Sequence, residues 1–277
     1  MIKDLEKKSK WIRQRIVKIC SVSKAGHITS SFSSVEILVS LYLARILRYD
    51  VNKPNWEDRD RFISKGHSTL AFYTVLAEAG YFPHSDVNSF CTKGTIFGCL
   101  TTTSVPGVEC YTGSLGHGLS YAVGQALSAR LKRKNFLVYV HTGDGECQEG
   151  SIWEAAMSIS KYKLTNIIWI IDRNEIQLTG RVKDTMNIDP FKEKLVSFGF
   201  DTKDVDGHNL KELITVLSVD RDNLPSKPLA IIANTVKGKG SPFLEHKLDW
   251  HNRKPNSKEL KIILNELDIS DEEFLLL

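Results

Sequence analysis

The chain has 277 residues and a hydrophobic content of 42%, enough to bury the core of one large domain, alone or with a small appendage. A net charge of +4 and the absence of RRM-like or zinc-finger patterns exclude an obvious nucleic-acid partner. No apolar run approaches the roughly 18 residues that a membrane span needs, so we expect no membrane association. The first 20 residues are charged throughout, so we expect no signal peptide. Five scattered cysteines without a CxxC pair favour reduced thiols in a cytoplasmic protein.

The first half of the chain is predicted to be mainly helical. Apolar residues at helical spacing predict helices within residues 1–48, with a turn-like break at KAGHITSS, residues 24–31. The segments that follow are a polar loop over 50–60, a helix over 68–80 closed by Gly80, an irregular Thr- and Gly-rich loop over 91–113, and a helix over 118–132.

From residue 136 onward, strands alternate with helices. The expected strands are FLVYVHT, NIIWIID, a weak FDTKDVD and PLAIIANT. Strands separated by helices of 10 to 15 residues predict an α/β fold, a parallel sheet flanked by helices on both faces. Residues 253–277 are expected to form a surface helix with a frayed tail. We therefore divide the chain into a domain over 1–255 and a C-terminal helical tail over 256–277.

Polar groups follow two consecutive strands of this sheet. Asp144 ends the first strand and Asn174 ends the second, and ligands bind beyond the carboxyl ends of parallel strands. With one backbone carbonyl, such as that of Ile176, they form an all-oxygen set that suits Mg²⁺. The sequence therefore predicts a magnesium site between these strand ends.

The same stretch favours a phosphate beside the magnesium. Gly143 and Gly145 leave room for a phosphate to approach the backbone, and a helix expected from about residue 148 points its N-terminus there. A magnesium diphosphate is the ligand that fits. The alternative is that GDG and Asn174 only shape turns, which GDG alone does not exclude.

Several motifs resemble those of transketolases, which use thiamine diphosphate. GDG followed by Asn about thirty residues later is similar to the thiamine diphosphate motif. KAGHITSS, DRDRFISKGHST, VPGVECYTGSLGHGLSYAVGQAL, KGKGSPF and DWHNRKP resemble further transketolase segments, in the family's order, from about residue 11 to 255. The resemblance implies the thiamine diphosphate-binding fold, specifically the diphosphate-binding half of a transketolase split into two chains.

The resemblance also implies residue roles. Asp144, Asn174 and the Ile176 carbonyl would carry Mg²⁺, and His27, His67 and His251 would act on substrate hydroxyls. The residues implied to bind the cofactor are Lys65, His67, Leu115, Gly116, His117, Gly143, Asp144, Gly145, Glu149, Asn174, Ile176 and Lys237. We assign the remaining histidines to surface or satisfied positions: His84, His141, His208 and His246.

Three positions bear on the partner subunit and the substrate. Glu149 and Glu154 match glutamates that lie at the family's subunit interface, although acids in a first helical turn are also favoured by the helix dipole. Cys99 or a neighbour stands where the family's GHP segment carries a substrate-binding histidine, which implies an altered sugar donor or acceptor.

The chain is too short for the family's pyrimidine-binding domain, which supplies the catalytic glutamate. The resemblance therefore implies transfer of a two-carbon ketol unit from a ketose, as a sugar or sugar phosphate, to an aldose. This transfer would require a second subunit, as a heterotetramer. The alternatives are an idle cofactor-binding or regulatory subunit, the alpha chain of a 2-oxo-acid dehydrogenase decarboxylase, and a plain Rossmann domain, although no GxGxxG follows a first strand.

Overall fold

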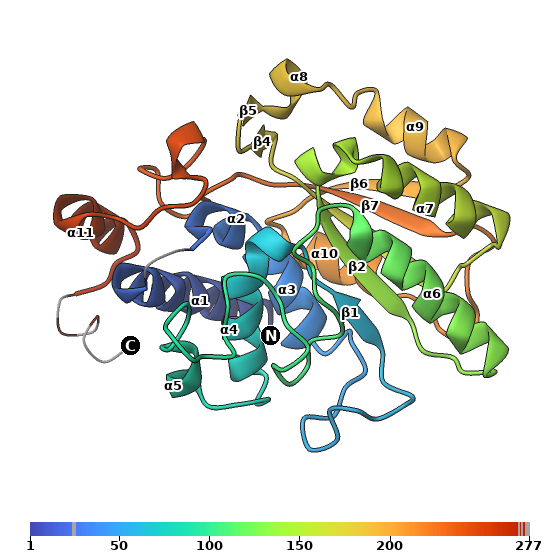
Figure 1. The fold of residues 1–277 in the computed structure, drawn as a ribbon, viewed down its shortest axis with the longest axis horizontal. Coiled ribbons are helices and arrows are strands. Elements are labelled where there is room, and N and C mark those ends of the chain that lie inside the picture. Colours follow the sequence, from blue (N-terminus) through green and yellow to red (C-terminus); the bar gives the residue numbers. More distant parts are fainter. Residues whose placement is uncertain (24–25, 271, 273, 275–277) are drawn as a thin grey trace.

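The computed structural model describes residues 1–23, 26–270, 272 and 274. A five-stranded parallel sheet lies at the centre of the fold (Figure 1). The strand order is β1-β2-β3-β7-β6, and all neighbours pair in parallel. The strands are β1 (Arg61–Ile63), β2 (Val138–Gly143), β3 (Ile167–Arg173), β6 (Asp201–Asp206) and β7 (Leu229–Asn234). The predicted α/β fold is confirmed.

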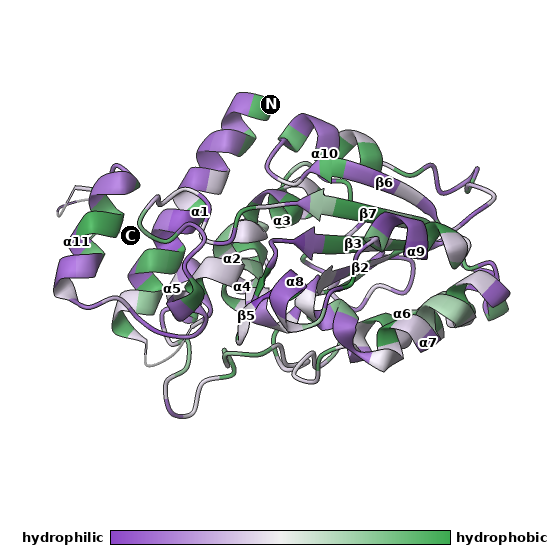
Figure 2. Cartoon of the chain, turned by 90° about the horizontal axis from the view of Figure 1, so that it is seen from above, coloured by the Kyte–Doolittle hydropathy of each residue, from purple (hydrophilic) through white to green (hydrophobic). Residues whose placement is uncertain are grey.

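Helices cover both faces of this sheet, as predicted (Figures 1 and 2). Ile168 and Ile170 of β3 pack in one core, whereas Trp169 and Ile171 pack in the other, because successive side chains point to opposite faces. The first core includes α1 (Ile2–Val22), α3 (Val35–Tyr42), α4 (Thr69–Glu78) and α10 (Leu210–Leu217). The second includes α6 (His117–Leu131), α7 (Gly150–Lys161) and α9 (Phe191–Ser197).

The main elements match the sequence predictions, with local differences. The predicted break at 24–31 contains a short helix, α2 (Ile28–Ser33), and the polar loop at 50–60 leads into β1, which was not predicted. After β2, a 3-10 turn η2 (Gly145–Gln148) precedes α7, so the helix begins at Gly150 rather than near residue 148. The weak fourth strand is real: β6 is the sheet edge and is partly exposed, which explains its polar sequence.

The remaining short elements lie in connections. They are η1 (Gly66–Ser68), α5 (His84–Val87), the β4–β5 hairpin (Ile176–Gln177 and Gly180–Arg181), α8 (Val182–Thr185) and η3 (Leu248–Trp250). None of them was predicted, because each is too short to show a hydrophobic period.

The predicted C-terminal helix is α11 (Ser257–Glu266), which begins with a capping box at Asn256. Ile263 and Leu264 are buried in the core that α1 shares. The boundary between residues 255 and 256 stays a prediction, and the predicted frayed tail falls largely on residues 271, 273 and 275–277, which lie outside the described part.

Two observations concern membrane insertion and the state of the cysteine thiols. Among the described residues, no helix has both the length and the apolar composition that crossing a membrane requires. The five cysteines are all unpaired thiols.

A buried ion pair joins α1 to α3. Arg13 Nη1 and Nη2 donate to the two carboxylate oxygens of Glu36 at 2.6 and 2.7 Å, and both side chains are less than a tenth exposed. Burial alone would raise the pKa of Glu36, but the charge of Arg13 and a bond from His208 lower it to about 2.

We predict that Glu36→Gln lowers the free energy of unfolding at neutral pH by about 3 kcal/mol, because the buried Arg13 charge loses its partner. The depressed pKa means that this stabilisation is complete above about pH 4.5 and disappears as the pH falls towards 2. Urea unfolding of both proteins across this range should therefore show a difference that shrinks at low pH. Glu6→Gln, at an exposed position of α1, is the control, and an equal loss there would contradict the prediction.

Candidate functional site

A cleft of about 390 Å³ opens at the carboxyl ends of β2 and β3. It lies there because all strands of the sheet run in one direction, so the loops after β2 and β3 meet at one edge. The lining residues are Ser30, Lys65, His67, Gly113, Leu115, Gly143, Asp144, Gly145, Glu146, Gln148, Glu149, Asn174, Ile176, Gln177, Leu178, Thr179, Lys237 and His251.

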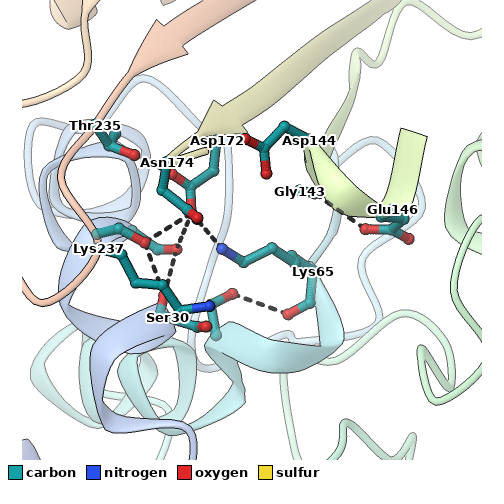
Figure 3. Close-up of polar contacts among 12 residues, drawn as sticks. Ser30, Lys65, Gly143, Asp144, Glu146, Asp172, Asn174, Thr235 and Lys237 are labelled. Carbon is teal, nitrogen blue, oxygen red and sulfur yellow. Dashed lines mark hydrogen bonds and ion pairs between the residues drawn. The ribbon is translucent and has the colours of Figure 1, made fainter. Parts of the chain in front are cut away.

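Asp172, the penultimate residue of β3, is the centre of the polar network beneath this cleft (Figure 3). Its fully buried carboxylate forms an ion pair with Lys65. It also accepts hydrogen bonds from Ser33, Ser34, Asn174 and Thr235. Burial by itself raises the pKa of a carboxylate, but the Lys65 ammonium holds the pKa of Asp172 well below its usual range.

The three predicted magnesium ligands all line the cleft. Asp144 follows β2, and its carboxylate accepts from the backbone N–H groups of Gly145 at 2.8 Å and Glu175 at 2.6 Å. Asn174 Oδ1 accepts a hydrogen bond from Ile176 N at 3.2 Å, which fixes the side-chain amide to the backbone of the loop after β3. Burial and the nearby Asp172 raise the pKa of Asp144 to about 6, so a cation beside it would be stabilised.

A backbone cradle forms the opposite wall. Glu146 accepts from Gly116 N at 2.9 Å and from Gly143 N at 3.1 Å, so one buried carboxylate ties the loop before α6 to the end of β2. A Cβ at Gly143 would meet Lys65 at 3.3 Å, and one at Gly145 would meet Gln177 at 3.0 Å. Glycine at both positions therefore avoids tight contacts with Lys65 and Gln177 and leaves the backbone without a side chain at the cleft.

Lys237 enters from the loop after β7. Its ammonium donates to the Ile176 carbonyl at 2.9 Å and lies 3.4 Å from His251 Nδ1. The side chain is 2% exposed, and burial together with Lys65 lowers its pKa to about 8. Lys237 and Lys65 thus place two cationic groups on one side of the cleft, which favours a polyanionic ligand.

Three histidines from distant segments meet at one side of the site. The ring centroids of His27 and His67 are 4.5 Å apart, those of His67 and His251 4.8 Å, and those of His27 and His251 5.3 Å. Burial is the largest cause that lowers their pKa values, to about 4 for His27 and His251 and about 3 for His67. All three imidazoles are therefore neutral at pH 7 and can each accept a proton.

The other predicted cofactor and interface residues lie around the rim. Leu115 and Glu149 line the cleft, whereas Gly116 is buried behind it with φ of 82°. His117 begins α6 and is exposed, and Glu154 is exposed on α7. The structure thus gathers the predicted set at one place, except that His27, Gly116 and His117 do not line the cleft itself.

Cys99 does not line the cleft, although Gly113, at the end of the same loop over 91–113, does. Leu100 and the Thr112 carbonyl of this loop lie against Gly66, between Lys65 and His67. Cys99 is partly buried beside Leu100. Cys99 is therefore adjacent in the chain to a residue that contacts the segment carrying His67. The family's substrate-binding histidine was expected at Cys99 or a neighbour.

One of the four remaining histidines contradicts the prediction of surface or satisfied positions. His141 on β2 is 1% exposed, and neither ring nitrogen has a hydrogen-bond partner within the described part of the chain. Burial lowers its pKa to about 3, so the ring is neutral. The other three fit the prediction: His84 bonds Glu78, His208 bonds Glu36, and His246 is exposed.

Sequence reasoning missed several site residues. Asp172 and Glu146 are the most important of them, although both stand within two residues of a predicted magnesium ligand, Asn174 and Asp144 respectively. For Asp172 the sequence signal was a carboxylate at the end of a buried strand. For Glu146 it was a carboxylate directly after GDG. The others line the cleft. Ser30 and Gly113 stand inside quoted motifs without having been singled out, whereas Gln148, Gln177, Leu178 and Thr179 belong to no motif.

Comparison with known proteins identifies the family to which this geometry belongs. Residues 6–276 match the family model described as transketolase, thiamine diphosphate binding domain. The chain is 41% identical to an apulose-4-phosphate transketolase subunit of Actinobacillus succinogenes over 95% of this chain and 96% of that protein. It is 35% identical to the 6-deoxy-6-sulfo-D-fructose transketolase subunit SqwG of a Clostridium species over 96% of both chains.

Solved structures agree with the sequence comparison. Transketolase from Campylobacter jejuni superposes with a TM-score of 0.88 and 27% identity, covering 98% of this chain and 43% of that one. Transketolase from Leishmania mexicana gives a TM-score of 0.86 and 25% identity, with the same coverage. The chain therefore spans about two-fifths of the length of these transketolases, and the predicted thiamine diphosphate-binding fold is confirmed.

We predict that Gly116→Ala destabilises the cradle. A Cβ there would lie 2.8 Å from Glu149 Cβ and closer still to Ser151 Oγ, and φ of 82° disfavours any L side chain. We expect a loss of about 1–3 kcal/mol in the free energy of unfolding, measured with urea. Gly150→Ala is the matched control, because a Cβ there meets nothing within 4 Å; equal effects of the two variants would refute the prediction.

Proposed function

Because the chain belongs to the family of transketolase thiamine diphosphate-binding domains, we propose that it is the diphosphate-binding subunit of a two-chain transketolase. The reaction is transfer of a two-carbon ketol unit from a ketose to an aldose. One observation carries the proposal: an oxygen ligand set, two buried lysines and the neutral imidazoles of His67 and His251 line one cleft, with the neutral ring of His27 packed beside those two.

We infer that Asp144, Asn174 and the Ile176 carbonyl hold Mg²⁺. The donors are all oxygens, which suits this ion, and the Ile176 carbonyl already binds a cationic group, the Lys237 ammonium. The diphosphate would lie against Lys65, Lys237 and the glycine cradle. That cradle is made by Gly116, Gly143 and Gly145, with Leu115, His117 and Glu149 at its rim.

The bound cofactor supplies the thiazolium ring that stabilises the carbanion. The histidines would do the proton chemistry around it. Cleavage between C2 and C3 of a ketose requires a base for the C3 hydroxyl, and a neutral imidazole from His27, His67 or His251 can accept that proton. His251 also contacts Lys237, so it lies where the diphosphate and the substrate would adjoin.

The proposed partner is a chain that carries the pyrimidine-binding domain and the catalytic glutamate. Two relatives are named as transketolase subunits, and this chain matches nearly the whole length of each. Exposed apolar side chains on α6 and α7, Tyr121, Leu131 and Met157, lie on the same elements as His117, Glu149 and Glu154. They support the predicted interface and a heterotetramer of two subunit pairs; a cytoplasmic location stays a prediction that rests on the unpaired cysteines.

The proposed donor is a ketose with a terminal anionic group. The two subunit relatives are named for a phosphorylated and a sulfonated sugar, respectively. The altered loop at Cys99 supports a substrate outside the usual sugar phosphates, because this loop packs against the segment that carries His67.

We predict that the chain isolated from its native host with thiamine diphosphate and Mg²⁺ carries a second chain of similar size in equal amount. The reconstituted pair should transfer ketol units, and either chain alone should show no transfer above background, because residues 6–276 match only the thiamine diphosphate-binding domain of the family and the catalytic glutamate is proposed to come from the partner. Asp144→Asn should abolish transfer by the pair, whereas Asp249→Asn at an exposed position should not. A homodimer that binds the cofactor without transfer would instead support an idle subunit.

We predict that Cys99→His changes the choice of sugar. The histidine would restore the family's substrate-binding group beside the segment of His67. The ratio of kcat/KM values for a common ketose phosphate and for the native donor should shift by about tenfold, which corresponds to one hydrogen bond at the substrate. Lys93→His, at an exposed position of the same loop, is the control; an unchanged ratio in the Cys99 variant would refute the role of this position.

A further inference from the structure

A three-residue turn after β6 holds the segment that delivers Lys237 to the cleft. Gly207 N donates to the Asn234 carbonyl at 2.8 Å, and a Cβ on Gly207 would meet the same oxygen at 3.0 Å. His208 N donates to Asp206 Oδ1 at 2.8 Å, which closes the turn. The turn therefore lies tightly against the end of β7, and only glycine fits at its centre.

The imidazole of His208 connects this segment to the helical layer. Val236 N–H donates to His208 Nε2 at 2.8 Å, so Nε2 must carry its lone pair and the proton lies on Nδ1. The Nδ1–H group then donates to Glu36 Oε2 at 2.9 Å. Arg13 holds Glu36 from the other side, so a buried carboxylate fixes both the tautomer and the orientation of the ring.

The backbone around Lys237 is fixed on both sides. Thr235 N donates to the Arg173 carbonyl and Gly238 N to the Thr29 carbonyl, each at 3.0 Å. Between them, the Val236 N–H group, directly before Lys237, donates to His208, and the Lys237 carbonyl accepts from His246 N at 3.0 Å. Loss of the bond to His208 would leave a backbone N–H without an acceptor directly before the lysine that lies on the Ile176 carbonyl.

We propose that His208 is a positioning residue for Lys237: held by Glu36, its ring fixes the Val236 amide and so aims the lysine ammonium at the cofactor diphosphate. This role rests on the proposed function, because it assigns the diphosphate to the Lys237 side of the cleft. The turn formed by Asp206, Gly207 and His208 would then contribute to cofactor binding as well as to packing.

Two substitutions separate the bonds of the ring. His208→Asn keeps a donor near Nδ1 for Glu36 but has no atom at the Nε2 position, whereas His208→Gln places an amide oxygen near Nε2 for Val236. We expect the Asn variant to raise the KM for thiamine diphosphate about tenfold in the complex with the partner subunit, with kcat for ketol transfer nearly unchanged. The Gln variant should stay within about threefold of wild type.

A double-mutant cycle with Lys237→Met decides whether the effect acts through the lysine. If it does, the double variant His208→Asn/Lys237→Met binds the cofactor no more weakly than Lys237→Met alone, because the lysine is no longer there to be positioned. Losses that multiply, or equal losses in the Asn and Gln variants, would overturn the proposal. His246→Asn is the control, since His246 is exposed and its φ of 61° suits asparagine. A wild-type complex that neither binds the cofactor nor transfers ketol units would instead refute the proposed function.

Discussion

The buried ion pair between Asp172 and Lys65 is the interaction on which the site depends. It joins the end of the central strand β3 to the loop after the edge strand β1, and hydroxyls from α2, the start of α3 and the loop after β7 converge on the same carboxylate. Breaking a buried pair leaves an uncompensated charge, so these segments are held to one arrangement. Most groups that line the cleft are attached to one of those segments or follow the end of β2, whereas Gly113 and Leu115 come from the loop before α6.

Burial at this site also sets the protonation state of His27, His67 and His251. Lys65 and Lys237 lie close enough to disfavour an imidazolium, and removal from water disfavours it further. The cations that suit a diphosphate therefore also keep the neighbouring imidazoles in their basic form. Binding of an anion is thus linked to protonation, because a bound anion would offset the cations that oppose an imidazolium.

The fold and much of the site could be predicted because their signals are local. Parallel strands read as apolar runs, and Gly143, Asp144 and Asn174 stand directly at strand ends. The hidden part depends on contacts between distant segments: Asp172 looks like any residue at a strand end until Lys65, 107 positions earlier, is seen to reach it. His208 and His141 are both single histidines beside a strand or in one. Only tertiary packing shows that His208 bridges Glu36 to a backbone amide and that His141 is buried with no hydrogen-bond partner among the described residues.

The bonding of the acidic side chains explains why a second chain is needed. Both oxygens of Glu146 accept backbone N–H groups of the cradle, and both oxygens of Asp144 accept backbone N–H groups of the strand-end loops. The third carboxylate lining the cleft, Glu149, is exposed at its rim. Within the described residues, every carboxylate that lines the cleft is therefore either bonded through both oxygens to backbone N–H groups or open to solvent. A carboxylate that acts on the cofactor ring in a dry environment must then come from the face that closes over this cleft, which is the contribution proposed for the partner.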